Sequence, residues 1–228
     1  MDARRRNYLD ALDVPVYTSV SRALAEPPSV EAAPLPVGAT SPAPSWDTLQ
    51  ATVAACAACA LARGRTQTVF GVGDRNARWM VVGEAPGAEE DRRGEPFVGR
   101  AGKLLDAMLA AAGAPRDRVY IANTLKCRPP DNRDPEPDEL AACRAFLDRQ
   151  IALVEPELIL AVGRIASQTL LNSTQPIGKL RGTVHRYGER GVALVCTYHP
   201  AYLLRSPGQK RRAWDDLKLA LGVAAPLA

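Results

Sequence analysis

Beyond residue 44, short and almost wholly apolar runs alternate with longer stretches of mixed polarity. The apolar runs predict strands at residues 78–82, 119–122, 158–162 and 192–195. The mixed stretches predict helices at residues 45–59, 101–112, 138–155, 164–171 and 210–221. Strands that alternate with helices and carry few polar positions form parallel sheets covered on both faces. The pattern therefore predicts an α/β fold, a three-layer αβα sandwich around a four-stranded, mainly parallel sheet.

The beginning of the chain follows a different pattern. Residues 21–44 are rich in proline, alanine and serine, which predicts a flexible, extended linker. Residues 1–20 carry Tyr8, Leu9 and Leu12 at spacings that line one face of a short helix. This segment is either a disordered end or a peptide that folds onto a partner protein. We expect four parts, at residues 1–20, 21–44, 45–222 (the compact domain) and 223–228 (a tail).

Composition and charge narrow the class of protein. The 228 residues suffice for one domain with a buried core, and their 46% apolar fraction is that of soluble globular proteins. No run of 18 apolar residues occurs, and the N-terminus has no apolar stretch typical of a secretory signal. Five cysteines without a disulfide framework indicate a reducing compartment, so we expect a cytoplasmic monomer. The net charge of +4 is compatible with a polyanionic partner.

Four of the five cysteines have the spacing of a metal centre. Two residues separate Cys56 from Cys59, 67 residues separate Cys59 from Cys127, and 15 residues separate Cys127 from Cys143. A close pair can bind one metal centre, and two further thiolates complete a four-sulfur site. Zinc, an iron–sulfur cluster and scattered buried thiols all fit this spacing. A zinc ribbon usually has two tight pairs, and the second pair here is looser, which favours the cluster.

Three polar residues follow three different apolar runs. Glu84, Asn123 and His199 each stand at or just beyond the carboxyl end of a predicted strand. Ligands bind at this edge of an open α/β sheet. We therefore expect the three side chains to face one crevice, although they lie 39 and 76 residues apart in the sequence.

Two of these residues have both a chemical and a structural interpretation. Asn123 offers an acceptor beside a donor, which matches the C=O and N–H edge of a pyrimidine, but asparagine also forms local turns. His199 precedes a proline at a chain reversal. Its neutral ring can donate a hydrogen bond to developing negative charge, or it can satisfy loop backbone.

The segment after the first strand adds a turn and an aromatic ring. Glycines on both sides of a proline make a rigid turn that brings backbone N–H groups close to a ligand, or else a plain strand-to-loop turn. Phe97 is one of only three phenylalanines, and it is either a core residue or a platform for a flipped base. The residues of the turn are Gly83, Glu84, Ala85, Pro86 and Gly87.

The segment after His199 combines apolar residues with cations. Apolar wedges beside phosphate-binding cations suit insertion into a nucleic-acid stack, whereas the same pattern also begins a solvated helix. The candidate DNA-binding residues are Tyr202, Leu203, Leu204, Arg205, Lys210 and Arg211.

In this order, the motifs resemble those of the family 4 uracil-DNA glycosylases, the iron–sulfur branch of the uracil-DNA glycosylase superfamily. The resemblance covers residues 50–221 and is specific because of the order, since each motif alone is weak. Besides the cysteines, it rests on Gly83 to Gly87, Pro96 to Gly99, Asn123 with Lys126 to Pro130, and His199 to Tyr202.

The resemblance implies a uracil-DNA glycosylase-like fold and a role for each motif. Phe97 would stack on a flipped uracil, Asn123 would pair with its O4 and N3–H, and His199 would donate to O2 as the base leaves. The loop from Tyr202 to Arg205 would enter the duplex. The same resemblance implies a [4Fe–4S] cluster on Cys56, Cys59, Cys127 and Cys143, away from the base, while Cys196 is a core residue.

One position departs from the superfamily's first family. That family has an aspartate, which steers the attacking water, at the third place of the first motif, where this chain has Ala85. Glu84 is the nearest carboxylate, with Glu90 and Asp91 in reserve. A carboxylate can also lower the barrier by stabilising a cationic sugar. We therefore take Glu84 and His199 as the catalytic candidates.

These observations predict a DNA-repair hydrolase that cleaves the N-glycosidic bond of deoxyuridine in single- or double-stranded DNA, leaving an abasic site. A related branch traps its substrate through a histidine in the loop after the asparagine, but residues 124–142 contain none, so release is expected. The alternatives are a non-catalytic iron–sulfur module that docks on DNA or the replication machinery, and a zinc-bound nucleotide hydrolase. Residues 4–17 resemble the start of the psi subunit of the bacterial clamp loader, which indicates a replication or clamp-loader partner.

Overall fold

The computed structural model describes residues 45–224. The predictions for residues 1–20 and 21–44, and for residues 225–228 of the tail, lie outside this part. Among the described residues, no helix has the length and apolar character needed to cross a membrane.

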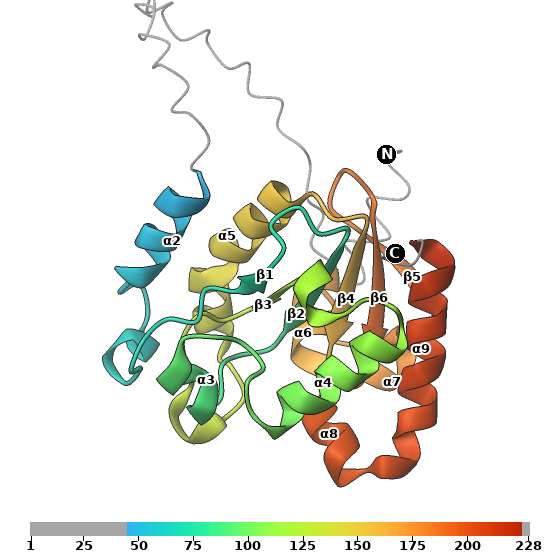
Figure 1. Ribbon diagram of the computed structural model, residues 1–228. Helices are drawn as coiled ribbons and strands as arrows, with labels where there is room; N and C mark the ends of the chain where they lie inside the picture. The colour runs from blue at the N-terminus through green and yellow to red at the C-terminus, as the bar shows by residue number, and fades with distance from the viewer. Residues whose placement is uncertain (1–44, 225–228) are drawn as a thin grey trace, which may run out of the picture. The chain divides into compact units, whose positions relative to one another are not determined.

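A six-stranded mixed sheet forms the centre of the fold (Figure 1). The strand order is β1-β3-β2-β4-β6-β5, and the four inner strands are parallel to one another. These four inner strands are the ones that the apolar runs predict. The two edge strands were not expected: β1 pairs antiparallel with β3, and β5 pairs antiparallel with β6. The bounds are β1 Val72–Gly73, β2 Trp79–Gly83, β3 Val119–Asn123, β4 Leu158–Val162, β5 Val184–Tyr187 and β6 Val192–Thr197.

Helices connect the strands and cover the sheet. All five predicted helices are present, and three shorter ones, α3, α7 and α8, join them. The bounds are α2 Trp46–Ala54, α3 Ala88–Arg93, α4 Arg100–Ala111, α5 Pro137–Val154, α6 Arg164–Leu171, α7 Ile177–Leu180, α8 Pro200–Arg205 and α9 Lys210–Val223. Short 3-10 turns lie at Ala60–Arg63, Arg116–Arg118, Pro130–Asn132 and Pro207–Gln209.

The first described helix is shorter than predicted. Ser45 caps α2 as expected, with its Oγ accepting from Thr48 N at 3.3 Å. The helix ends at Ala54, so Cys56 and Cys59 lie in the following turn and not on the helix. Alanine-rich sequence favours continuation, but tertiary packing overrides a weak propensity. In this turn, Cys56 and Cys59 line the same pocket as Cys127 and Cys143.

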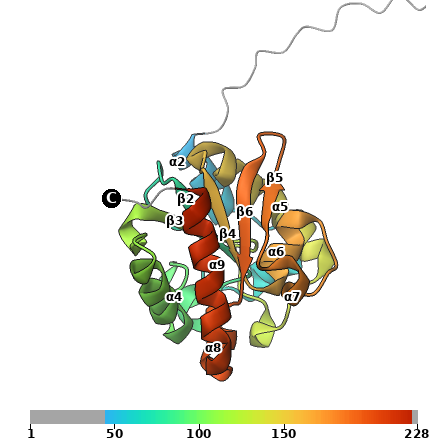
Figure 2. The same ribbon diagram turned by 90° about the vertical axis from the view of Figure 1, so that its right-hand side faces the viewer.

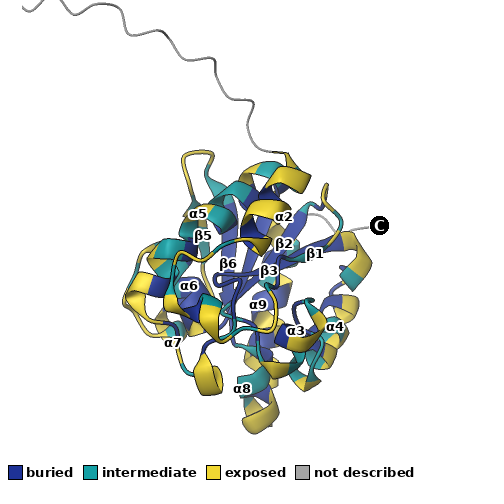
Figure 3. Cartoon of the chain, turned by 90° about the vertical axis from the view of Figure 1, so that its left-hand side faces the viewer, coloured by how far each residue is buried: buried dark blue, intermediate teal, exposed yellow. Residues whose placement is uncertain are grey.

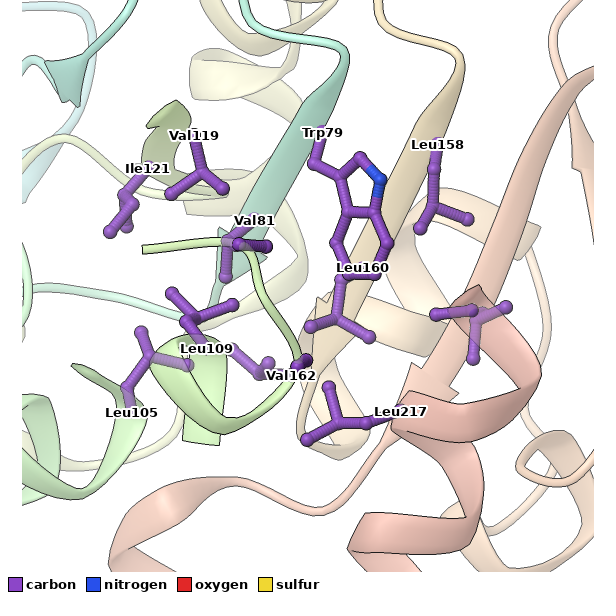
Figure 4. Close-up of a cluster of buried hydrophobic side chains, with 14 of the residues drawn as sticks. Trp79, Val81, Leu105, Leu109, Val119, Ile121, Leu158, Leu160, Val162 and Leu217 are labelled. Atoms are coloured by element: carbon purple, nitrogen blue, oxygen red, sulfur yellow. The ribbon is translucent and has the colours of Figure 1, made fainter. Parts of the chain in front are cut away.

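The helices form two layers, one on each face of the sheet (Figure 2). On one face, α4 and α9 pack on alternate strand residues, among which Trp79 and Leu160 are fully buried, as the close-up in Figure 4 shows. On the other face, α5, α6 and α7 pack on the remaining set, which includes Met80 and Ile159. Figure 3 shows the strands almost wholly buried and the outer helix faces exposed. The predicted three-layer αβα sandwich is confirmed.

The strand order places a ligand site at one edge of this sheet. From β2 the chain moves to β3 on one side, and then crosses to β4 on the other side of β2. Ligands in open α/β folds bind outside the carboxyl ends of the strands at such a reversal of order. The segments that follow β2, β3 and β6 meet there, and two of them lead into α3 and α8 (Figure 1).

Candidate active site

A cleft of about 820 Å³ lies at the carboxyl ends of the central strands. Glu84 after β2, Asn123 at the end of β3 and His199 after β6 all line it, together with Phe97. The structure thus brings together the residues that sequence analysis expected to share one crevice. Ala85, Pro86 and Gly87 also line the cleft.

Two glycines allow the side chains to converge. A Cβ at Gly83 would lie 2.4 Å from Asn123 Oδ1 and 2.6 Å from the ring of Phe97. Gly163 has φ +101°, and a Cβ there would lie 3.0 Å from Cβ of His199. Only glycine leaves this space and adopts the second conformation without strain. Gly83 therefore acts beneath the site, because it shapes the cleft without lining it.

Asn123 carries an unsatisfied acceptor at the cleft. The residue is only 2% exposed, and Oδ1 accepts no hydrogen bond from any residue that the structure describes. A buried polar atom without a partner is costly, and native proteins rarely keep one without a function. The amide is therefore prepared to accept a donor from a ligand in the cleft.

Phe97 is held in a strained conformation. Its φ is 55°, a left-handed value that is rare for a residue with a side chain and often marks a functional site. Arg116 donates to the carbonyl oxygens of Pro96 at 2.6 Å and Phe97 at 3.4 Å. The Phe97 ring lies 5.7 Å from that of His199, at an interplanar angle of 30°. The two rings thus form adjoining walls of the cleft.

Glu90 fixes the two loops that carry these groups. Its carboxylate accepts from Gly87 N at 3.1 Å and from Val98 N and Gly99 N at 3.0 Å each. Glu90 lines the cleft, but these hydrogen bonds make it a support for the turn and the aromatic ring. Asp91, the other reserve carboxylate, is buried and accepts from Thr66 N, outside the residues that line the cleft.

His199 is a neutral hydrogen-bond donor. It caps the N-terminus of α8, where its Nδ1 accepts from Ala201 N at 3.1 Å. With Nδ1 acting as an acceptor, the proton of the neutral ring is on Nε2. Burial, reinforced by nearby Arg205, lowers the pKa of His199 to about 4. At neutral pH the ring therefore offers an uncharged Nε2–H to a ligand.

Glu84 has a strongly altered acidity. Burial raises its pKa to about 7, with Asp134 adding to the shift and Arg164 opposing it. Asp134 and Arg164 form an ion pair and line the cleft, as does Arg133. Sequence analysis missed these three. For Arg164, the signal was present, because it follows an apolar strand and a glycine, as Glu84 does.

The segment after His199 is only partly as expected. Tyr202 and Arg205 line the cleft, and Leu204 is 37% exposed on α8. Leu203 is 1% exposed and packs in a cluster with Tyr198, so the prediction that its side chain contacts DNA is wrong. Adjacent residues on a helix point about 100° apart, and here Leu203 points into the core while Leu204 points outward. The other two candidate cations, Lys210 and Arg211, are exposed at the start of α9.

The four predicted ligand cysteines line one apolar pocket: Cys56, Cys59, Cys127 and Cys143. Arg65 Nη1 donates to Cys127 Sγ at 3.1 Å, and Lys126 N donates to Cys143 Sγ at 3.3 Å. Burial raises the pKa of Cys143 to about 11. Within residues 45–224, no three cysteine, histidine or carboxylate side chains are arranged around a single metal ion. Cys196 is buried on β6 and is not among the residues of this pocket.

Comparison with known proteins shows the family to which the chain belongs. Residues 70–218 match the family described as the uracil DNA glycosylase superfamily. The chain belongs to this superfamily. The match includes Glu84, Phe97, Asn123 and His199, and begins after Cys56.

Individual members of the superfamily are similar over most of this chain. A type-4 uracil-DNA glycosylase of Archaeoglobus fulgidus is 42% identical over 181 residues, which span 76% of this chain and 90% of that protein. One of Sulfurisphaera tokodaii is also 42% identical over 181 residues, spanning 76% and 82%. One of Thermotoga maritima is 45% identical over 159 residues, spanning 69% and 82%. The resemblance to type-4 enzymes of the uracil DNA glycosylase superfamily is therefore confirmed.

Proposed function

We propose that this superfamily member excises uracil from DNA by hydrolysing the N-glycosidic bond of deoxyuridine, which leaves an abasic site for base excision repair. The observation that carries the proposal is the unpartnered, buried Oδ1 of Asn123 beside Phe97 and His199. Uracil presents an N3–H donor next to its O4 acceptor, which complements the asparagine amide.

Recognition requires the base to leave the DNA stack. A flipped base can be read on its Watson–Crick edge while an aromatic side chain covers its face. In this proposal, Asn123 Oδ1 accepts from N3–H, the amide nitrogen donates to O4, and the ring of Phe97 stacks on the pyrimidine. The outward-facing Leu204 of α8 enters the gap in the duplex, and Tyr202, Arg205, Lys210 and Arg211 bind the backbone around it.

Release of the base depends on stabilising a departing anion. The N-glycosidic bond breaks with negative charge developing on O2 of uracil and positive charge on the sugar. His199 donates its Nε2–H to O2. The hydrogen bond from Ala201 N of α8 already fixes the position of the ring, so this uncharged donor needs no reorganisation as the charge develops. Glu84, as a carboxylate, stabilises the cationic sugar and orients the water that completes hydrolysis. No covalent enzyme intermediate is required.

We infer that the four cysteines hold a [4Fe–4S] cluster. Four cysteine side chains that face one apolar pocket supply, once deprotonated, the donor set of such a cluster. N–H donors to sulfur, as from Arg65 and Lys126, commonly surround it. The group would supply a cross-link between the turn after α2, the segment at Cys127 and α5. It would take no part in removing the base.

Replacement of Asn123 by alanine tests the recognition step. We expect a rate loss of about 10- to 100-fold on a uracil oligonucleotide, because a bidentate base contact carries roughly 1–3 kcal/mol of discrimination. Binding to undamaged DNA should stay unchanged, because the phosphate contacts remain. Single-turnover cleavage and a filter-binding titration measure the two effects. Equal rates for the variant and the wild type would remove Asn123 from the base pocket.

We also propose that residues 1–20 dock on a replication or clamp-loader protein. The linker at residues 21–44 joins this peptide to the domain at residues 45–222, which carries all of the catalysis. Each residue invoked in base removal lies in the last of these ranges. Deletion of residues 1–40 should therefore leave cleavage of a short uracil oligonucleotide within about twofold and abolish co-purification with the clamp loader. An inactive truncated protein would contradict this division of the chain.

A further inference from the structure

Lys126 is a fully buried cation whose side chain has only neutral acceptors. It is 1% exposed, and Nζ donates to the backbone oxygen of Asn123 at 2.8 Å and to Oε1 of Gln150 at 2.6 Å. No carboxylate in the described part of the chain forms an ion pair with it, and the ionisable group that interacts with its charge is Cys143. Lysine is almost never fully buried without a charged partner, because removing an ammonium group from water is unfavourable. The burial of Lys126 therefore needs an explanation beyond ordinary packing.

The cation holds the backbone from which the base-reading amide projects. Asn123 Oδ1 has no protein donor in residues 45–224, so the position of its side chain depends on the main chain at that residue. The next two residues are bound to the turn at Gly83 to Gly87, with Thr124 N donating to Gly83 O at 2.9 Å and Leu125 N donating to Glu84 O at 3.0 Å. The ammonium group of Lys126 then fixes the carbonyl group of Asn123 through its hydrogen bond.

The same residue also contacts the cysteine pocket, through its backbone. Lys126 lines this pocket, and its N–H donates to Cys143 Sγ at 3.3 Å. Gln150 lies two helical turns after Cys143, on the same face of α5. The Gln150 amide nitrogen donates in turn to Phe70 O at 2.8 Å and Tyr120 Oη at 3.2 Å, which fixes its orientation. Lys126 thus bridges two sites that lie on different elements.

We propose that Lys126 is a positioning residue for uracil recognition, whose side chain fixes Asn123 while its backbone ties the same segment to the cysteine site. The inference rests on the proposed function, because it takes Asn123 as the residue that reads uracil. A lysine that only stabilised the core would lower stability without acting through Asn123. A positioning lysine must lose its effect on the rate once the Asn123 amide is gone.

A double-mutant cycle makes this distinction. Lys126→Met keeps an unbranched side chain one atom shorter than that of lysine and removes its donors. It is compared with Asn123→Ala, the double variant and the wild type. We expect Lys126→Met to slow single-turnover uracil release by about 10- to 100-fold, as for loss of a hydrogen bond from a charged group. The double variant should match Asn123→Ala alone within about twofold, because residues acting through one group are not additive.

Two further measurements separate positioning from general damage. Iron content and visible absorbance report on the cysteine site, and both should be unchanged in Lys126→Met, because the backbone N–H to Cys143 remains. Arg144→Met is a matched control, since it removes a half-buried cation of α5 that donates to Asp148 and Thr169. Its uracil release should stay within about twofold of the wild-type rate.

Three results would overturn the inference: a wild-type rate for Lys126→Met, a full additional loss in the double variant, or loss of iron. A wild-type rate for Asn123→Ala would instead refute the proposed base-reading role, so the two failures are distinguishable. If Lys126→Met does not fold, the cycle is run with Lys126→Arg, which keeps the charge but not a compact donor. A smaller loss is then expected, and it should again vanish in the Asn123→Ala background; persistence there would overturn the inference.

Discussion

Replacement of His199 by alanine is expected to slow the single-turnover release of uracil by about 10²–10³-fold, the effect of losing one preorganised donor to a developing anion. His199 Nδ1 is occupied by Ala201 N, so Nε2–H is the donor that remains, and the depressed pKa of about 4 keeps the ring neutral. The variant should still bind uracil-containing DNA, because Asn123 and Phe97 are untouched. Rapid-quench assays with enzyme in excess isolate this step.

His185 provides the matched control for this experiment. It is the only other histidine of the chain, it lies on β5, and its Nε2 is 2.6 Å from the backbone oxygen of Leu180. His185→Ala should keep the wild-type rate within about twofold, since His185 is half-buried and lies outside the residues that line the cleft. If His199→Ala is as fast as His185→Ala, His199 is a structural cap of α8 and nothing more.

The pH profile separates His199 from Glu84. The carboxylate is the form of Glu84 that can stabilise a cationic sugar, and its pKa is raised to about 7. The rate should therefore rise with pH through about 7 and then level off. His199→Ala should keep this rise at a lower rate, whereas Glu84→Gln should remove it. A rise that survives in Glu84→Gln would assign the titration to another group.

Replacement of Cys143 by alanine is expected to abolish cluster binding and to destabilise the domain. The wild type should contain about four irons per chain and absorb broadly near 400 nm, as thiolate-bound iron does. Loss of a cross-link of this kind should lower the melting temperature on the order of 10 °C, by analogy with the loss of a native disulfide. Iron analysis, visible spectra and thermal melts measure these effects on anaerobically purified protein.

Cys196 is the control for the cysteine experiment. Its side chain is fully buried on β6 and does not line the pocket of the other four cysteines. Cys196→Ala should therefore keep all of the iron and lose only the small packing energy of one sulfur atom. Stoichiometric zinc in a colourless wild type, or full iron in Cys143→Ala, would contradict the assignment of the cluster.

The inner strands could be predicted from the sequence because each is a continuous apolar run that is buried on both faces. The edge strands could not. β1 has two residues. β5 has four, three half-buried and one exposed, and the polar residues His185 and Arg186 interrupt its apolar character. Helix α3 has six residues, and all of them after Ala88 are charged, so it shows no helical spacing of apolar residues. The two edge strands form because the neighbouring strands β3 and β6 pair with them, and α3 forms with Glu90 bound to Gly87 N at its start. The local pattern of apolar residues does not show these contacts.

Strand ends placed Glu84, Asn123 and His199 together, because topology alone decides that the carboxyl ends of parallel strands share an edge. The state of each side chain was not accessible in this way. The left-handed conformation of Phe97 is accompanied by a hydrogen bond from Arg116 to its carbonyl oxygen and by hydrogen bonds from Val98 N and Gly99 N to Glu90, both with partners distant in sequence. The burial of Lys126 runs against the ordinary behaviour of lysine, so its link to Asn123 is visible only in three dimensions.

The most direct test of uracil excision is the incubation of the 228-residue, iron-loaded protein with a short oligonucleotide that contains one uracil, followed by treatment with alkali. The account predicts free uracil and a strand broken at the uracil position, while a matched oligonucleotide with thymine there stays intact. An intact uracil strand after exposure to excess folded protein with full iron content would contradict the proposed function.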